Sequence, residues 1–461
     1  MPDSTPLTSE QAADLVLQLL NANEELQAKV RSLEAQVAAL QKENADLRSR
    51  LDGGGTGVKA VPDWVKPNRP DRESTTRKKR DKACVRPKQA PTQVHVHAVE
   101  RCPDCDRKLE GGWVHRTREV IEIPATPVEI IEHVALARWC GVCGKRRIPS
   151  LDLSNAVVGK HRVGVRLMSL IGWLREMGRM PVRRIQALLE ATYRLHLSVG
   201  EICEVLHTLA EKGAPTYKKL QEAVRAHPFV HADETGWRED GVNGYLWSFS
   251  TPAVRFFVHD RSRSHEVPEQ TLGADWNGIL CSDFYSGYYY HHGLHQRCWV
   301  HLARDLKALV EKNAGDAGLS RWVRSVLDIY RRAKEFRHDG RRERIRARER
   351  FQEELARAAE PHARSDCPQR VLAERIERFL PELFTFVEHP DVPPDNNAAE
   401  RALRPSVIAR KVSGGTRSSA GSTTRSILMS LFATWQAQGL DALFACQTML
   451  TSRAEPAPAN A

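Results

Sequence analysis

Five short apolar runs between residues 228 and 299 constrain the fold of this chain more than any other feature. Runs of this length, rich in Val, Phe, Tyr and Trp and bounded by turn residues, are typical of β-strands. The runs are PFVHAD, GYLWSFS, VRFFVHD, GILCSD and QRCWV. The first ends at Asp233 and the fourth at Asp283. The pattern therefore predicts a sheet whose first and fourth strands each present one carboxylate.

A third acid, Glu400, opens the alanine- and arginine-rich stretch that follows DNNAA, which has helical character. Carboxylates from two strand ends and a helix can converge on a pair of hard cations, which favour oxygen ligands. Two such ions, about 3.5–4 Å apart, can activate an attacking oxygen and stabilise a leaving one in phosphoryl transfer. Each acid alone is better explained as a solvated turn residue or a helix cap, but the three together favour nuclease or transposase chemistry. Glu234 should point to the opposite face of its strand, so we leave it out of the site.

Length and charge indicate a multidomain protein with an anionic partner. The 461 residues are too many for one compact core. The 69 Lys and Arg residues outnumber the 58 Asp and Glu residues, for a net charge of +11. This surplus favours nucleic acid as a partner, although a merely basic soluble protein has the same composition. The sequence has no run of 18 apolar residues and no signal-peptide pattern, which predicts a cytoplasmic protein without a membrane partner.

The N-terminal segment 8–51 carries a heptad repeat. The leucines of the repeat are Leu19, Leu26, Leu33, Leu40 and Leu47, and the second seam position holds Val16, Asn23, Val30, Val37, Asn44 and Leu51. Leucine at one seam position with valine and a buried asparagine at the other is typical of a two-stranded parallel coiled coil. We therefore predict a leucine zipper that makes the protein a homo-oligomer. The alternative is a single amphipathic helix packed on its own protein.

Two segments of biased composition are predicted to be disordered. Residues 52–92 are rich in Lys, Arg and Pro and include RKKR at 77–80, so they form either a basic arm along DNA phosphates or a solvated spacer. The Ala- and Pro-rich tail at 452–461 is the second such segment.

Two Cys-x2-Cys pairs lie in the segment 93–152, on either side of a stretch predicted to form short alternating strands. The pairs are Cys102 with Cys105, and Cys140 with Cys143. Ten cysteines in this arrangement are typical of a metal site in a reducing compartment rather than a disulfide framework. Two pairs of thiolates complete a closed tetrahedral Zn²⁺ site, so we predict a structural zinc-finger module. A redox pair is the alternative.

Helical patterns precede and follow the predicted sheet. Within 160–215, Ser198 and Glu201 have capping-box spacing, which predicts a helix that starts near Val199. With the helix before it, this helix fits a helix-turn-helix that enters a major groove of DNA, although an ordinary helical bundle also fits. Residues 302–388 are helical and basic, and form an insertion that either contacts DNA or presents a solvated face.

The sequence resembles the transposases of the insertion sequence 66 family, within the DDE superfamily. The resemblance covers most of the chain and rests on HADETGWR, SDFYSGY, QRCWVHLARDL and DNNAAERALRP, in that order. The zipper, the two cysteine pairs and the long gap before the third acid match the family layout. Together with the strand order, the resemblance implies a multidomain α+β protein with an RNase H-like α/β catalytic domain. This domain comprises 225–301 and 389–447, with 302–388 inserted into it.

The resemblance implies that Asp233, Asp283 and Glu400 are the catalytic triad and hold two Mg²⁺ ions, or Mn²⁺ in their place. It implies a transposase that binds the terminal inverted repeats of its element, cuts their 3′ ends and joins them to target DNA. Its partners would be double-stranded DNA and small accessory proteins of the same element, and it would be nucleoid-associated when bound to DNA. An RNase H-like structure-specific nuclease and a catalytically silent DNA-binding regulator are the alternatives.

Four basic residues after the third acid are candidates for DNA contacts. Arg401 and Arg404 would bind phosphates or else pair with nearby acids. Arg410 and Lys411 precede VSGGTRSSAGSTTRSILMSL, whose glycine and hydroxyl residues are also candidates for phosphate contacts. The wording of this stretch departs from the commonest family version.

Two other short motifs lie near the predicted site. Cys298 and His301 match a Cys-x2-His signature of the family, which is either a structural element beside the sheet or part of a metal site. Asp395, Asn396 and Asn397 precede the helix of Glu400 and are expected to cap its start.

Overall fold

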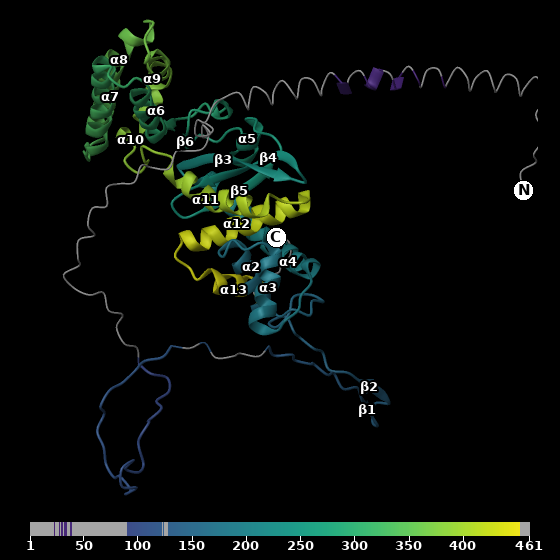
Figure 1. Cartoon of the computed structure of the whole chain (residues 1–461). Coiled ribbons are helices and arrows are strands. Elements are labelled where there is room, and N and C mark those ends of the chain that lie inside the picture. The colour runs from purple at the N-terminus through teal and green to yellow at the C-terminus, as the bar shows by residue number, and fades with distance from the viewer. Residues whose placement is uncertain are drawn as a thin grey trace, which may run out of the picture. The chain divides into compact units, whose positions relative to one another are not determined.

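The computed structural model describes residues 90–121, 123 and 128–451, together with a few helical positions near the N-terminus. Those positions are Asn23, Gln27, Lys29, Val30, Ser32, Leu33, Glu34, Val37 and Ala38. The chain divides into two compact units, Met1–Glu122 and Ile123–Ala461. The described residues form helices α2–α13 and strands β1–β7 (Figure 1), which confirms the predicted mixed α and β class.

Three predicted segments fall wholly or largely outside the described residues. They are the coiled coil at 8–51, the basic linker at 52–92 and the tail at 452–461. Among the residues that the structure does describe, no helix is both long enough and apolar enough to cross a membrane.

The stretch between the cysteine pairs forms fewer strands than its alternating pattern predicts. Of its described residues, only β1 (Arg138–Cys140) is a strand, which pairs antiparallel with β2 (Lys145–Arg147). The prediction of short strands from residue 118 onward is therefore wrong for the residues that the structure describes. Ile121, Ile130 and Val134 are all more than half exposed, so the apolar face of the pattern is not buried there. Strands without a packed face are at best marginally stable in water.

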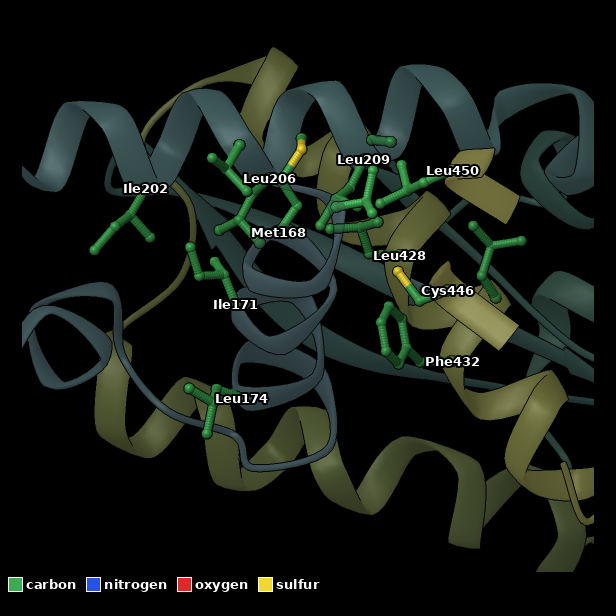
Figure 2. Packing of buried hydrophobic residues seen from close by; sticks show 14 of the residues in the cluster. Met168, Ile171, Leu174, Ile202, Leu206, Leu209, Leu428, Phe432, Cys446 and Leu450 are labelled. Atoms are coloured by element: carbon green, nitrogen blue, oxygen red, sulfur yellow. The ribbon is translucent and has the colours of Figure 1, made fainter. Parts of the chain in front are cut away.

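Five helices share one core. They are α2 (Val165–Glu176), α3 (Val182–Tyr193), α4 (Val199–Ala226), α12 (Ser419–Ala437) and α13 (Ala442–Thr451). Figure 2 shows Met168 and Ile171 of α2 packed with Leu209 of α4, Leu428 of α12 and Cys446 of α13. The core therefore joins helices from the two ends of the described unit. A buried ion pair between Glu176 and Arg425, 2.9 Å apart, fixes α2 on α12.

The helix start predicted at Val199 is confirmed. The Ser198 hydroxyl accepts the Glu201 N–H at 3.1 Å, and the Glu201 carboxylate accepts the Ser198 N–H at 2.7 Å. This reciprocal pair satisfies two of the helix's unpaired donors. The first turns of α4 expose two acids, Glu201 and Glu204, while the segment that begins α3 exposes arginines. Those arginines are Arg179, Arg183 and Arg184.

A five-stranded sheet follows, in the order β5-β4-β3-β6-β7. The strands are β3 (Phe229–Glu239), β4 (Val242–Ser250), β5 (Arg255–Asp260), β6 (Ile279–Ser282) and β7 (His295–Arg297). The first three are antiparallel neighbours, and β6 and β7 continue the sheet in parallel with β3. A short helix, α5 (Glu266–Leu272), and a 3-10 turn (Ser286–Tyr288) lie in the connections. A strand forms at each of the five apolar runs, but β7 ends at Arg297, and the rest of QRCWV begins a helix.

Helices cover both faces of the sheet. The C-terminal half of α4 packs with Val230, Ala232 and Trp247 on one face. On the other face, α11 (Asn397–Ser413) and α12 pack against Trp237 and Leu246, as the yellow helices beside the strands in Figure 1 show. Successive side chains of a strand point to opposite faces, so Asp233 lies on the α11 side and Glu234 on the α4 side.

Hydroxyl groups of α12 close one edge of the sheet. Alternate residues of edge strand β5 point their N–H groups away from β4, and three side chains spaced one turn apart on α12 accept them. The pairs are Arg255 N–H to Thr434 at 3.0 Å, Phe257 N–H to Ser430 at 2.8 Å, and His259 N–H to Ser426 at 3.1 Å. An uncovered edge is a template for pairing with another strand. Ser426 and Ser430 belong to the stretch that the sequence offered for phosphate contacts, but their buried hydroxyls serve the sheet instead.

The helical segment at 302–388 builds a core of its own. Its helices are α6 (Trp299–Lys312), α7 (Ala317–Glu335), α8 (Arg341–Ala363), α9 (Arg370–Leu383) and α10 (Thr385–Glu388). Several arginines pair with acids: Arg332 lies 2.5 Å from Glu354, and Arg348 lies 2.5 Å from Glu388. At its end, Thr385 and Phe386 bind β7, the other sheet edge, through the His295 carbonyl at 2.5 Å and the Gln296 side chain at 2.9 Å.

Substitution of Gly213 in α4 should destabilise the protein, although alanine is the better helix former. A Cβ at this buried position would overlap the Leu431 side chain of α12, and overpacking costs about 1–3 kcal/mol. We expect Gly213→Ala to lower the free energy of unfolding measured by chemical denaturation. Gly200→Ala, on the exposed start of the same helix, is the control and should stabilise by up to about 1 kcal/mol. Equal effects at both positions would contradict the packing.

Candidate active site

Strand pairing brings two of the three acids side by side. Parallel strands β3 and β6 pair Phe229 with Ile279 and His231 with Cys281, a constant offset of 50 residues. Asp233 and Asp283 are also 50 residues apart, so continuing the register places them opposite one another. Neighbouring strands lie about 4.8 Å apart. The two carboxylates therefore meet at one end of the parallel pair.

Helix α11 brings the third acid to the same place. Glu400 lies in the first turn of α11, which packs on β3. The pKa of Asp233 is raised to about 8, first by burial and then by the negative charges of Glu234, Asp283 and Glu400. All these carboxylates are therefore within electrostatic reach of Asp233. A cluster of like charges of this kind is stabilised when a cation binds.

Each aspartate has one oxygen held by a backbone N–H. Asp233 Oδ1 accepts the N–H of Glu234 at 2.9 Å, and Asp283 Oδ1 accepts the N–H of Tyr285 at 2.9 Å. The second oxygen of each carboxylate has no hydrogen-bond partner among the described residues. Glu400 Oε1 is buried and is likewise unpartnered within the described part of the chain. Oxygen ligands from three carboxylates fit hard divalent cations such as Mg²⁺.

Glu234 lies on the opposite face, as its position on the strand predicts. Its carboxylate accepts hydrogen bonds from the Arg263 guanidinium at 2.6 Å and from the Tyr288 hydroxyl at 2.6 Å. Burial raises the pKa of Glu234, while these two bonds oppose the rise. Arg263 also stacks over the Tyr285 ring, 3.9 Å from its centroid. Glu234 is therefore committed to a network beneath the site rather than to the site itself.

Arg297 connects the helical insertion to Asp283. Its side chain is only 1% exposed. The guanidinium donates to the Asp283 carbonyl at 2.8 Å and to the Ser282 hydroxyl at 3.0 Å. Its Nε lies 2.5 Å from the carboxylate of Glu382 in α9. Arg297, which lies in the apolar run QRCWV, thus supports the backbone of Asp283.

Cys298 and Asn396 join the start of α6 to the start of α11. The Cys298 Sγ accepts the Asn396 N–H at 3.2 Å, and the neighbouring Trp299 N–H donates to the Pro394 carbonyl at 3.0 Å. Asn396 also donates from its side chain to the Ala232 carbonyl at 2.7 Å and lies 3.1 Å from the His231 ring. The same residue therefore reaches the strand of Asp233.

The capping role predicted for the asparagines is only partly correct. Asn396 is the N-cap residue of α11, but its side chain makes no capping hydrogen bond, because both of its polar atoms bind β3. Asp395 instead accepts the N–H of Asn397 at 3.1 Å. No local pattern around Asn396 indicates that its side chain binds a strand residue 164 positions earlier.

His301 approaches the third acid. Its Nε2 lies 3.7 Å from Glu400 Oε1, and with Cys298 the two residues offer three ligand atoms that all lie within 4.8 Å of one another. A thiolate, an imidazole and a carboxylate are residue types that can bind a metal ion. However, burial raises the pKa of the Cys298 thiol, which disfavours the thiolate that a metal needs. The sequence singled out His301 by its motif but did not connect it with Glu400.

The four basic candidates around the third acid differ in exposure. Arg401, Arg404 and Lys411 are exposed on α11. Arg410 is half-buried and donates to the Gly236 carbonyl and, at 3.3 Å, to the Thr235 hydroxyl of β3. The first three therefore face solvent, while Arg410 holds α11 on the sheet.

The glycine-rich loop after α11 is also joined to β3. The Thr416 N–H donates to the Arg238 carbonyl at 2.9 Å, and the Thr416 carbonyl accepts the Asp240 N–H at 2.8 Å. Gly415 has a φ of +134°, and a Cβ there would overlap the Arg238 carbonyl. The loop needs glycine at position 415 for this close approach. The backbone packing alone therefore explains this glycine of the motif, with no need for a bound phosphate.

Each cysteine pair lies in its own tight turn. In the first, the Asp106 N–H donates to the Cys102 carbonyl at 2.9 Å; in the second, between β1 and β2, the Gly144 N–H donates to the Cys140 carbonyl at 2.9 Å. Backbone N–H groups of the turns lower the pKa of both leading thiols, chiefly the N–H of Asp104 for Cys102 and that of Cys143 for Cys140. Both turns thus favour thiolates.

Asp233→Asn should stabilise the protein in Mg²⁺-free buffer at alkaline pH. The pKa of the Asp233 carboxyl rises from 3.8 to about 8 on folding, so the native state keeps a proton that the unfolded chain releases. Its contribution to stability is complete below about pH 4 and is lost as the pH rises through about 8. The variant lacks this titration, so calorimetry should show a higher Tm at pH 8 and a flatter dependence of Tm on pH.

The control is Asp240→Asn, an exposed turn residue at the end of the same strand. It should leave the pH dependence of the Tm as in the unsubstituted protein. If the Tm of Asp233→Asn changed with pH in parallel with that of the unsubstituted protein, the raised pKa of Asp233 would be refuted.

Comparison with known proteins agrees with the motifs. The model of the family described as "Transposase IS66 family" matches residues 160–424, more than half of the chain. Two uncharacterized proteins of Sinorhizobium fredii (strain NBRC 101917 / NGR234) are similar to it. The protein y4jO is 31% identical over 149 residues, 32% of this chain and 45% of y4jO. The protein y4jD is 24% identical over 478 residues, 91% of this chain and 90% of y4jD. This chain therefore spans less than half of y4jO but most of y4jD. On the family match, which confirms the resemblance seen in its motifs, the chain belongs to the IS66 family of transposases.

Proposed function

We propose that this chain binds the terminal inverted repeats of an insertion sequence, cuts their 3′ ends and joins them to target DNA. The observation that carries the proposal is the convergence of Asp233, Asp283 and Glu400 from two adjacent parallel strands and one helix. We assign residues 225–301 and 389–447 to an RNase H-like catalytic domain. Its sheet order and the positions of its first two acids support this assignment.

The three carboxylates would hold two Mg²⁺ ions, which supply activation of the attacking oxygen and stabilisation of the leaving one. The protein's own contribution is to fix the ligands before DNA arrives. The backbone N–H groups of Glu234 and Tyr285 orient the two aspartates, and Arg297 holds the carbonyl of Asp283. Preorganisation of this kind lowers the reorganisation cost of the reaction.

Exposed arginines supply two surfaces for DNA phosphates. On α11, Arg401 and Arg404 lie one and four residues after Glu400, where they would bind the strand that enters the site. At the start of α3, Arg179, Arg183 and Arg184 would contact an element end. The acidic first turns of α4 are unfavourable for phosphate contacts, so α3 rather than α4 is the better DNA-facing element of this helix pair.

The remaining parts of the chain fit an assembly on DNA. The heptad repeat at 8–51 would pair two copies so that two element ends meet. The protein would act in the cytoplasm, at the nucleoid when DNA-bound, alone or with accessory proteins of its element. Residues 93–152 would form the zinc-finger module.

The experiment for the catalytic proposal uses a labelled element end, Mg²⁺ and the full chain. Asp233→Asn, Asp283→Asn and Glu400→Gln should each abolish 3′-end cleavage and joining, because each removes one charged ligand of the cations. Binding of the element end, measured by mobility shift, should remain. The control is Asp240→Asn, which should retain activity.

Unchanged cleavage and joining in all three variants would reject the triad. Cleavage without joining by the unsubstituted chain would favour the nuclease alternative. End binding with no cleavage under any condition would favour the DNA-binding regulator.

For the zinc module, we expect about one structural zinc ion per chain, held by two pairs of thiolates. Cys105→Ser and Cys143→Ser should each remove that zinc, as measured by elemental analysis of the purified full chain. Cys203→Ser, a single cysteine in α4, should not change the zinc content. A zinc-free protein that folds normally would exclude the module.

A further inference from the structure

We infer that His301 is a positioning residue for Glu400, to which its ring donates a hydrogen bond that fixes one carboxylate oxygen and leaves the other to the cations. The inference deepens the proposed function and rests on it. His301 lies in the first turn of α6, and its Nε2 is 3.7 Å from Glu400 Oε1. The proposed hydrogen bond requires these two atoms to come about 0.5 Å closer.

Within the part of the chain that the structure describes, Glu400 lacks the backbone hydrogen bond that orients each of the two aspartates. Asp233 and Asp283 each have one oxygen held by a backbone N–H, which leaves the second oxygen of each for a ligand. Glu400 is on a helix, where its own backbone N–H donates to the Asn396 carbonyl at 3.2 Å, and its side chain is longer by one rotatable bond. Its Oε1 has no hydrogen-bond partner among the described residues, and the ring nitrogen that approaches it is Nε2 of His301, 3.7 Å away. Carboxylates that bind metals are typically held by such outer hydrogen bonds.

The surroundings of the ring select the tautomer that can donate. The Nδ1 of His301 is buried and has no hydrogen-bond partner in the described part of the chain. A buried N–H without an acceptor costs about 1–3 kcal/mol. A neutral ring therefore carries its proton on Nε2, the nitrogen that faces Glu400. The donor is available without a positive charge on the ring.

The backbone fixes the distance between the two residues. Cys298 at the start of α6 accepts the Asn396 N–H at the start of α11, and the adjacent Trp299 N–H binds the Pro394 carbonyl. His301 and Glu400 lie three and four residues beyond Cys298 and Asn396, one turn into each helix. The Cys-x2-His spacing thus places the Cys298 sulfur where α6 and α11 begin, and places the His301 ring beside Glu400 of α11.

Metal binding by Cys298, His301 and Glu400 together is the competing explanation of the same cluster. It requires a thiolate, whereas Cys298 is 1% exposed and its sulfur already accepts a backbone N–H. The two explanations differ in metal content, because a second zinc ion would be lost from Cys298→Ser and His301→Ala alike.

The experiment measures Mg²⁺ binding to the full chain without DNA, from the rise of Tm with Mg²⁺ concentration. His301→Ala should raise the half-saturating Mg²⁺ concentration by about 10-fold, the lower end of the effect of losing such a partner. His301→Gln has an amide N–H that can replace Nε2–H, so its half-saturating Mg²⁺ concentration should lie within about 3-fold of that of the unsubstituted chain. His292→Ala, at an exposed histidine of the preceding loop, is the control and should leave Mg²⁺ binding unchanged.

Three results would overturn the inference. One is a lower Tm in His301→Ala with unchanged Mg²⁺ binding, which indicates a purely structural histidine. Another is an equal loss in His301→Ala and His301→Gln. The third is the loss of one zinc equivalent from Cys298→Ser and His301→Ala. Failure of the proposed function is distinguishable, because Mg²⁺ binding would then also be unaffected by Glu400→Gln and Asp283→Asn.

Discussion

Asn396 makes the contacts on which the geometry of the candidate site depends most. Its side chain binds the Ala232 carbonyl and the His231 ring on β3, while its backbone N–H binds Cys298 at the start of α6. One buried residue therefore links the strand of Asp233, the helix of Glu400 and the segment that follows β7. Each of these bonds lies out of water, so losing one would leave a polar group unpaired at a cost of about 1–3 kcal/mol. The start of α11 is rigid for this reason.

Rigidity is needed because the site gathers like charges. Burial and neighbouring carboxylates raise the pKa of Asp233 to about 8, so the metal-free protein keeps the cluster at an energetic disadvantage. Beneath it, Arg263 and Tyr288 bind the carboxylate of Glu234, which holds this fourth acid on the other face of the sheet. Perturbed carboxylates of this type are common at catalytic sites, where their repulsion favours binding of a cation. In the proposed site, the repulsion within the metal-free cluster would favour binding of Mg²⁺.

Local patterns predicted the strands and the start of α4, because each depends on neighbours in sequence. Short apolar runs bounded by turn residues predicted β3 to β7, and the Ser198 capping box predicted that a helix starts near Val199. The catalytic role of the three acids rests on the family resemblance and stays a prediction. Contacts between distant segments could not be predicted from one sequence. Arg410 looked like a DNA contact but binds Gly236, and His301 meets an acid 99 residues later. The prediction of strands in the alternating stretch after residue 118 was wrong, because an alternating pattern forms a stable strand only where its apolar face packs on another surface. The described apolar side chains of this stretch are exposed.

The closure of strand β5 has a consequence for biosynthesis. The hydroxyl that accepts the His259 N–H lies 167 residues later, in α12. At about 5–20 residues per second, the ribosome needs on the order of ten to thirty seconds to deliver it. During that interval the nascent sheet has an open edge of unpaired N–H groups, which other strands can join. A chain truncated before α12 would keep that edge permanently, so premature termination should yield aggregates rather than a smaller folded enzyme.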